Sequence, residues 1–155
     1  MYSLTLVLHS WWRWVVLVLV LVATWRGIIG NRQARAWTDS DRRVNMFTTI
    51  ALDVQMLLGL LLYLFLSPFT VEAFKDFGAA MRTPGLRYWA VEHLATMVAA
   101  VIVAHVGNVM ARKGASDGAR HLRSAIFFGI VVLLLLFGTP WPGLPNGRPL
   151  FRFGM

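Results

Sequence analysis

Four apolar blocks dominate the sequence, and each is long enough, or nearly long enough, to cross a lipid bilayer as a helix. They cover residues 4–28, 46–66, 88–111 and 124–138, and a spanning helix needs about 20 residues. In lipid, a helix is the structure in which a single segment satisfies its own backbone hydrogen bonds. The sequence therefore predicts an all-α protein, a single transmembrane domain over residues 1–155 built as an integral membrane four-helix bundle.

The composition excludes several other classes of protein. Hydrophobic residues make up 57% of the chain and charged residues 14%, whereas roughly a quarter of the residues are charged in soluble domains. The absence of Cys excludes disulfides, thiolate metal sites and iron–sulfur clusters. The net charge of +8 would suit nucleic acid, but nearly all the Arg and Lys residues lie between the apolar blocks. Membrane topology explains them there, so we expect a lipid bilayer and no nucleic acid as a partner.

The distribution of basic residues predicts the orientation of the bundle. Residues 26–43 contain five Arg and residues 112–123 contain four basic residues, against three in 67–87 and two after 138. Basic loops stay preferentially in the cytoplasm. We therefore expect the first and third connections to be cytoplasmic and both termini to lie on the outer, periplasmic side.

Polar residues cluster at one depth of the first and third apolar blocks. His9 and His93 each lie about five residues into a helix that enters from the outer face, about 8 Å below the helix start. Arg13 is one turn deeper than His9 on the same helical face, and Glu92 directly precedes His93. We expect these four polar groups to converge in the outer leaflet.

Three interpretations of this cluster remain open from the residues alone. Two facing imidazoles can hold a b-type haem by both axial positions, so His9 and His93 are candidate ligands of the haem iron. Arg13 would then neutralise a propionate or pair with Glu92, and Glu92 could alternatively orient an imidazole by a hydrogen bond. The cluster could also be a satisfied polar network that joins two helices, or a quinone site that uses His and Glu as proton partners.

The remaining polar residues carry weaker expectations. Asp53 and His105 lie at a similar depth toward the cytoplasm, and we expect them to form a structural ion pair. His121 is flanked by Arg120 and Arg123 at the membrane edge, so we expect it to be solvated. Residues 67–85 are expected to form either a short helix on the membrane surface or an ordinary loop. No Ser–His–Asp order, P-loop or dinucleotide motif is present, so we expect no autonomous catalytic activity.

Several strings in the sequence together resemble a known group of proteins. They are Leu8-His9-Ser10 with Arg13-Trp14, Asp41-Arg42-Arg43, Gln55 with Leu57-Leu58-Gly59-Leu60 and Tyr63, Ala90-Val91-Glu92-His93, and Pro140-Trp141-Pro142. The chain resembles, nearly end to end, short four-span bacterial membrane proteins labelled cytochrome b-like. The resemblance implies haem b, electron transport and a multi-pass protein of the bacterial inner membrane.

Two functions are therefore expected. The first is a haem-binding or electron-transfer subunit with His9 and His93 as axial ligands. The second is a non-catalytic accessory subunit that packs against other subunits of a larger respiratory or photosynthetic membrane complex, using aromatic helix faces and the Pro-rich tail as contacts.

Overall fold

The computed structural model describes residues 1–152, and these residues are mostly helical. The four long helices, in chain order, are α1 (Tyr2–Arg32), α2 (Asp39–Leu61), α6 (His93–Arg112) and α7 (Asp117–Gly138).

Two of the long helices are extended by π-helical turns. The turn η1 (Leu62–Leu66) continues α2, while η2 (Tyr88–Glu92) links the short helix α5 (Pro84–Arg87) to α6. With these extensions, all four helical segments are long and apolar enough to cross a membrane. The expected four-span, all-helical architecture is confirmed, and each helical segment is longer than its predicted apolar block.

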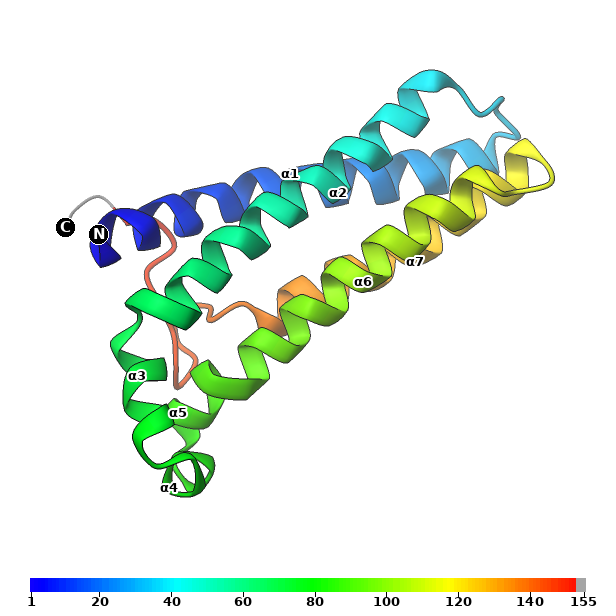
Figure 1. Cartoon of the computed structure of the whole chain (residues 1–155). Coiled ribbons are helices and arrows are strands. Elements are labelled where there is room, and N and C mark those ends of the chain that lie inside the picture. Colours follow the sequence, from blue (N-terminus) through cyan, green and yellow to red (C-terminus); the bar gives the residue numbers. More distant parts are fainter. Residues whose placement is uncertain (153–155) are drawn as a thin grey trace.

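The long helices pack as neighbours in a bundle that opens at one end. α1 contacts α2 and α7, and α6 contacts α7 and α2. In Figure 1, α1 and α6 diverge toward the end at which the chain begins, and the short helices α3 (Pro68–Lys75) and α4 (Phe77–Arg82) lie at that end with α5. Residues 67–85 are thus helical in part, and their placement on a membrane surface remains a prediction.

Small residues allow α6 to approach its neighbours closely. Ala100, Ala104, Gly107 and Ala111 are buried along one face of this helix at spacings of four and three residues. A Cβ atom added at Gly107 would collide with Phe127 of α7. Close backbone approach is how membrane helices gain packing energy when lipid is as apolar as the side chains.

The end of the bundle opposite the opening is held by a buried carboxylate. Asp41 is 2% exposed and forms ion pairs of 2.7 Å with both Arg26 and Arg35. It also accepts a hydrogen bond from the backbone N–H of Thr38, while the Thr38 hydroxyl accepts one from the Asp41 backbone in a capping box that begins α2. This carboxylate therefore fixes the connection between α1 and α2.

The expectation that His121 is solvated is wrong. Its side chain is fully buried between α7 and α1, with its ring edge-on to Trp37 at a centroid distance of 4.9 Å. Gly30 of α1 makes room for the ring, because a Cβ atom there would overlap the imidazole. The neighbouring arginines point elsewhere: Arg120 to Gly114 and Asp117, and Arg123 to the carbonyl oxygen of Met110.

Candidate functional site

A cavity of about 130 Å³ lies inside the open end of the bundle. Since a cavity volume of about 10–15 Å³ is enough for one water molecule, this cavity can hold a ligand larger than water. Its walls come from α1, α2, η1, α3, the start of α6, the end of α7 and the segment 139–152. Most of the lining is apolar, and the polar exceptions include His9, Arg13, Gln55, His93 and Arg148.

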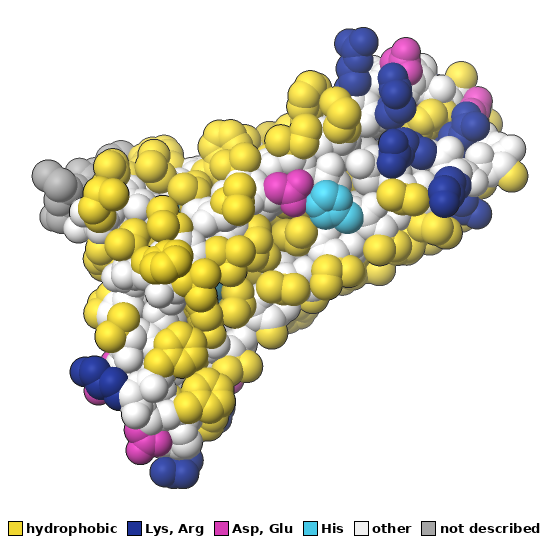
Figure 2. Space-filling view, viewed as in Figure 1, with side chains coloured by type: hydrophobic (Ala, Val, Ile, Leu, Met, Phe, Trp, Pro, Cys, Tyr) yellow, Lys and Arg dark blue, Asp and Glu magenta, His cyan; other side chains and the backbone are white. Residues whose placement is uncertain are grey.

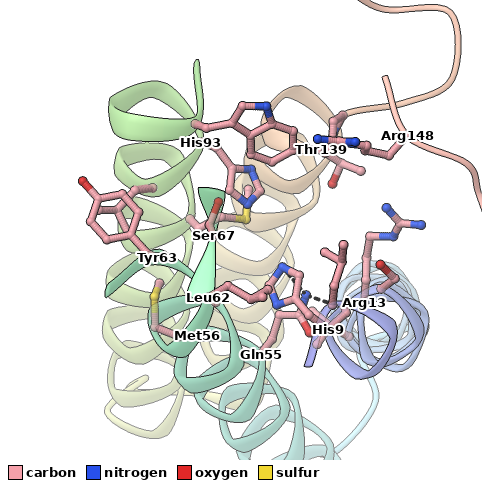
Figure 3. Close-up of a pocket in the computed structure, with 18 of the residues that line it drawn as sticks. His9, Arg13, Gln55, Met56, Leu62, Tyr63, Ser67, His93, Thr139 and Arg148 are labelled. Carbon is pink, nitrogen blue, oxygen red and sulfur yellow. Dashed lines mark hydrogen bonds between the residues drawn. The ribbon is translucent and has the colours of Figure 1, made fainter. Parts of the chain in front are cut away.

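The imidazoles of His9 and His93 face each other across this cavity. Figure 3 shows both rings projecting inward, His9 from α1 and His93 from α6. Their centroids are 6.5 Å apart, and their planes meet at 75°. Two imidazoles that bind one metal ion at nitrogen–metal distances of about 2.0–2.1 Å have ring centroids about 6 Å apart. The two rings are therefore separated by nearly the distance that one shared metal ion requires.

The hydrogen bond of His93 fixes which ring nitrogen remains available. Nδ1 of His93 lies 2.7 Å from the carbonyl oxygen of Gly138, at the end of α7. A carbonyl oxygen can only accept, so Nδ1 carries the proton and Nε2 of the neutral ring holds a lone pair. A ligating His typically donates its second N–H to a backbone carbonyl or a carboxylate in this way. His93 is thus oriented as a ligand would be.

His9 is held by Gln55 of α2. The amide nitrogen of Gln55 donates to the backbone oxygen of His9 at 3.1 Å and lies 3.3 Å from its ring Nε2. The other ring nitrogen, Nδ1, is buried without a hydrogen-bond partner, as is Oε1 of Gln55. Gly59 lies against the ring, because a Cβ atom added there would come within 3.2 Å of Cε1 of His9. Nδ1 of His9 is therefore a buried polar atom with which a bound group could pair.

Arg13 joins this site, and it pairs with no carboxylate of residues 1–152. Its Nη2 donates to the backbone oxygen of Leu150 at 2.9 Å, and its guanidinium lies over the rings of Trp14 and Trp141. The Nε atom of Arg13 is buried without a partner. Arg13 therefore keeps an uncompensated positive charge beside the two imidazoles.

The segment after α7 forms part of the cavity wall. The indole nitrogens of Trp11 and Trp14 donate to the backbone oxygens of Arg152 and Leu150, which attaches the segment to α1. The guanidinium of Arg148 lies over the rings of Phe69 and Trp89, at 4.9 and 5.1 Å from their centroids. Figure 3 shows this side chain on the His93 side of the cavity. The segment thus supplies a second cation.

Glu92 lies outside the cluster to which we expected it to belong. Its carboxylate is 47% exposed and forms an ion pair of 2.6 Å with Arg87. In an α-helix, residues five positions apart would point about 140° away from each other. The π-helical turn η2 spans 88–92 and brings such residues onto one side. Three of the four expected residues therefore surround the cavity, and Glu92 does not.

The expected pair of Asp53 and His105 is present, on a different surface. Nε2 of His105 lies 2.8 Å from Oδ1 of Asp53, and both side chains are substantially exposed on the outside of the bundle. Within residues 1–152, no group of three or more His, Asp or Glu side chains is arranged to hold a metal ion. A metal between His9 and His93 would thus need further ligands from a cofactor such as a haem macrocycle.

Sequence reasoning assigned no role in the site to three of its members: Gln55 and Gly59, which appeared in a string that carries the family resemblance, and Arg148. Gln55 and Gly59 are four residues apart, which places them one helical turn apart on the face of α2 toward α1. Arg148 follows α7 in a Pro-rich segment, where no periodicity predicts the direction of a side chain.

Comparisons with family models, with curated proteins and with solved structures give no match for this chain.

Proposed function

We propose that this chain is an integral membrane protein that binds a b-type haem between His9 and His93 and serves as an electron-transfer subunit. The observation that carries the proposal is the pair of inward-facing imidazoles, whose centroids are 6.5 Å apart in a cavity between helices. Cofactor sites in helical bundles are commonly built from side chains on facing helices.

The second contacts of the two imidazoles support this proposal. The carbonyl oxygen of Gly138 accepts a hydrogen bond from Nδ1 of His93 and leaves Nε2 for a ligand. This hydrogen bond also makes the ring more basic. Gln55 holds His9 by its backbone oxygen and approaches Nε2, so that Nδ1 is the buried nitrogen without a partner. In the tautomer that is protonated at Nε2, Nδ1 would hold the lone pair that a metal needs. Both rings are therefore fixed before any ligand binds, which lowers the entropic cost of binding.

The cations at the cavity fit the acidic edge of a haem. Arg13 and Arg148 line the cavity, and neither forms an ion pair with a carboxylate in the described residues. Each would neutralise a propionate. A bound haem supplies a one-electron iron couple, and the apolar lining keeps water from the iron, which is one way that a protein sets the potential.

The test is a reduced-minus-oxidised absorbance spectrum of the purified protein after expression with ample haem. We expect a b-type band that is lost or strongly altered in His9→Ala and in His93→Ala, because six-coordinate iron loses a nitrogen donor in each. His105→Ala is the matched control, and it should keep the band. A colourless parent protein would refute the haem proposal and leave the accessory-subunit function.

A quinone is the second candidate ligand, and it suits the other tautomer of His9. With the amide nitrogen of Gln55 donating to Nε2, neutral His9 would carry an unpartnered proton on Nδ1 that a quinone oxygen could accept. His93 offers an acceptor, Nε2, across the same cavity. A protein without a haem band that binds a soluble ubiquinone analogue, and loses this binding in His9→Ala, would support this candidate instead.

A further inference from the structure

A polar pair lies exposed on the apolar surface of the bundle. Asp53 of α2 and His105 of α6 are hydrogen-bonded at 2.8 Å, with side chains 42% and 51% exposed. Figure 2 shows acidic and histidine side chains side by side within a largely hydrophobic face. Asp53 lies fourteen residues after Asp39, and His105 lies seven residues before Arg112, which are the ends of their membrane-spanning segments on the same side. The pair is therefore about two or more helical turns inside the span.

Lipid is a poor environment for this pair. Ionisable side chains within spanning helices are rare, and they almost always face the bundle interior, a water-filled cavity or another polar group. The observed hydrogen bond uses one oxygen of the carboxylate and one nitrogen of the imidazole. A carboxylate can accept further bonds and the second imidazole nitrogen can form another. The unused capacity points to a further polar partner.

The exposed residues around the pair follow the spacing of a helix-packing seam. On both helices one row of side chains on the outer surface is separated by four, three and four residues, with the polar residue third. The rows are Met46, Ile50, Asp53 and Leu57 on α2, and Val98, Ile102, His105 and Val109 on α6. Exposed apolar residues of α7 have the same spacing, so the polar position is what distinguishes this face. A single polar position in a coiled-coil seam of a/d spacing typically fixes register and oligomer state.

We propose that this face, the Asp53–His105 seam, binds a second copy of this chain in the membrane. The two polar residues are complementary as hydrogen-bonding groups, and they lie at one depth because they contact each other within a chain. A two-fold axis along the membrane normal preserves depth, so it brings Asp53 of each copy level with His105 of its partner. The seam is thereby complementary to itself, as a two-fold interface must be.

Symmetry explains why a second copy fits better than lipid or a different subunit. In the dimer, two Asp53 carboxylates and two His105 imidazoles share hydrogen bonds across the interface. A different subunit would need an unrelated polar pair at the same depth. Other exposed faces have no polar pair that requires a further partner, since the middles of α1 and α7 expose apolar side chains such as Val18 and Leu133. The proposal is independent of haem binding.

The test uses the absence of Cys in the native chain. Leu57 and Ile102 lie on the same side of the polar pair along the bundle, because α2 and α6 run in opposite directions. Two differently tagged copies, one carrying Leu57→Cys and the other Ile102→Cys, are co-expressed and oxidised in native membranes. We expect a disulfide-linked dimer that carries both tags. The control pair, Val18→Cys with Leu133→Cys, should give no more than background.

A second measurement separates the polar contact from general hydrophobic association. In Asp53→Leu/His105→Leu, the monomer–dimer equilibrium constant measured in mixed micelles should weaken by about tenfold, since two symmetry-related polar contacts are lost. The matched control is Glu72→Leu/Lys75→Leu, which removes an exposed ion pair on α3 and should leave the constant unchanged. Absence of the 57–102 cross-link would overturn the proposal, whether lipid or another subunit covers the seam. Equal cross-linking of the control pair, or an unchanged constant in the double Leu variant, would overturn it as well.

Discussion

Gly30 of α1 and His121 of α7 pack directly against each other, and their coupling can be measured. The imidazole of His121 fills the space that a side chain at position 30 would occupy, and both of its nitrogens lack hydrogen-bond partners. The ring is enclosed by Trp37 and the backbone of α1, so it cannot turn away as the end of a flexible side chain could. Gly30→Ala should therefore force the helices apart or displace the ring.

The expected magnitude follows from two opposing effects. Replacing Gly by Ala within a helix stabilises it by about 1 kcal/mol. Adding a methyl group to a filled core site costs about 1–3 kcal/mol. In the native background Gly30→Ala should thus change the free energy of unfolding by about 0 to −2 kcal/mol. In a His121→Ala background the clash is absent, and the same substitution should be stabilising by about 1 kcal/mol.

The assay is a double-mutant cycle of unfolding in mixed micelles titrated with a denaturing detergent. The four proteins are the parent, Gly30→Ala, His121→Ala and the double variant. We expect a coupling free energy of about 1–3 kcal/mol. If Gly30→Ala were equally stabilising in both backgrounds, the ring would not occupy the space over Gly30, and the argument for its burial would fail.

Three further predictions concern the two ends of the bundle. Asp41→Ala removes two ion pairs and the capping box of α2. It should lower the free energy of unfolding in the same assay by about 2–3 kcal/mol. The control Asp39→Ala, which removes an exposed ion pair, should lower this free energy by less than about 1 kcal/mol. Gly59→Ala places a methyl group 3.2 Å from Cε1 of His9 and should weaken the haem band, whereas Gly129→Ala, 3.8 Å from the nearest atom of Thr24, should leave it unchanged. Reporter fusions at residues 39 and 117 should place both connections in the cytoplasm, and an outside location for either would contradict the predicted topology.

Helix periodicity and depth predicted the parts of the structure that regular α-helices position. His9 and His93 were expected at one depth because both lie five residues into helices that start at the same face, and their rings do face each other. The pairing of Asp53 with His105 followed from the same argument and is present. Both predictions needed only the rise per residue and the order of the spans.

The errors arose where local geometry departs from that regular pattern. Glu92 pairs with Arg87 because a π-helical turn changes which residues share a face. The spacing of apolar residues in the sequence does not predict such a turn. His121 was expected in solvent because arginines flank it, but its ring is buried in the space that the absence of a side chain at Gly30 leaves on α1. Contacts of this kind depend on how helices are paired in space, which composition and periodicity do not specify.

Gln55 offers a last test, because it separates the stability of the site from its ability to bind a ligand. Its amide nitrogen forms two contacts with His9, while its buried Oε1 has no partner. Losing hydrogen bonds costs about 1 kcal/mol each, and removing an unsatisfied buried acceptor returns about 1–3 kcal/mol. Gln55→Leu should therefore change the free energy of unfolding by less than about 1 kcal/mol.

The same substitution should alter the ligand site, because the ring of His9 loses the group that orients it. Under the haem proposal, we expect Gln55→Leu to keep a b-type band but to shift its midpoint potential, since hydrogen bonds to an axial His tune the iron. A loss of stability above about 2 kcal/mol with an unchanged potential would mean that Gln55 only joins α1 to α2. In that case the orientation of His9 must come from Gly59 and the packing around it.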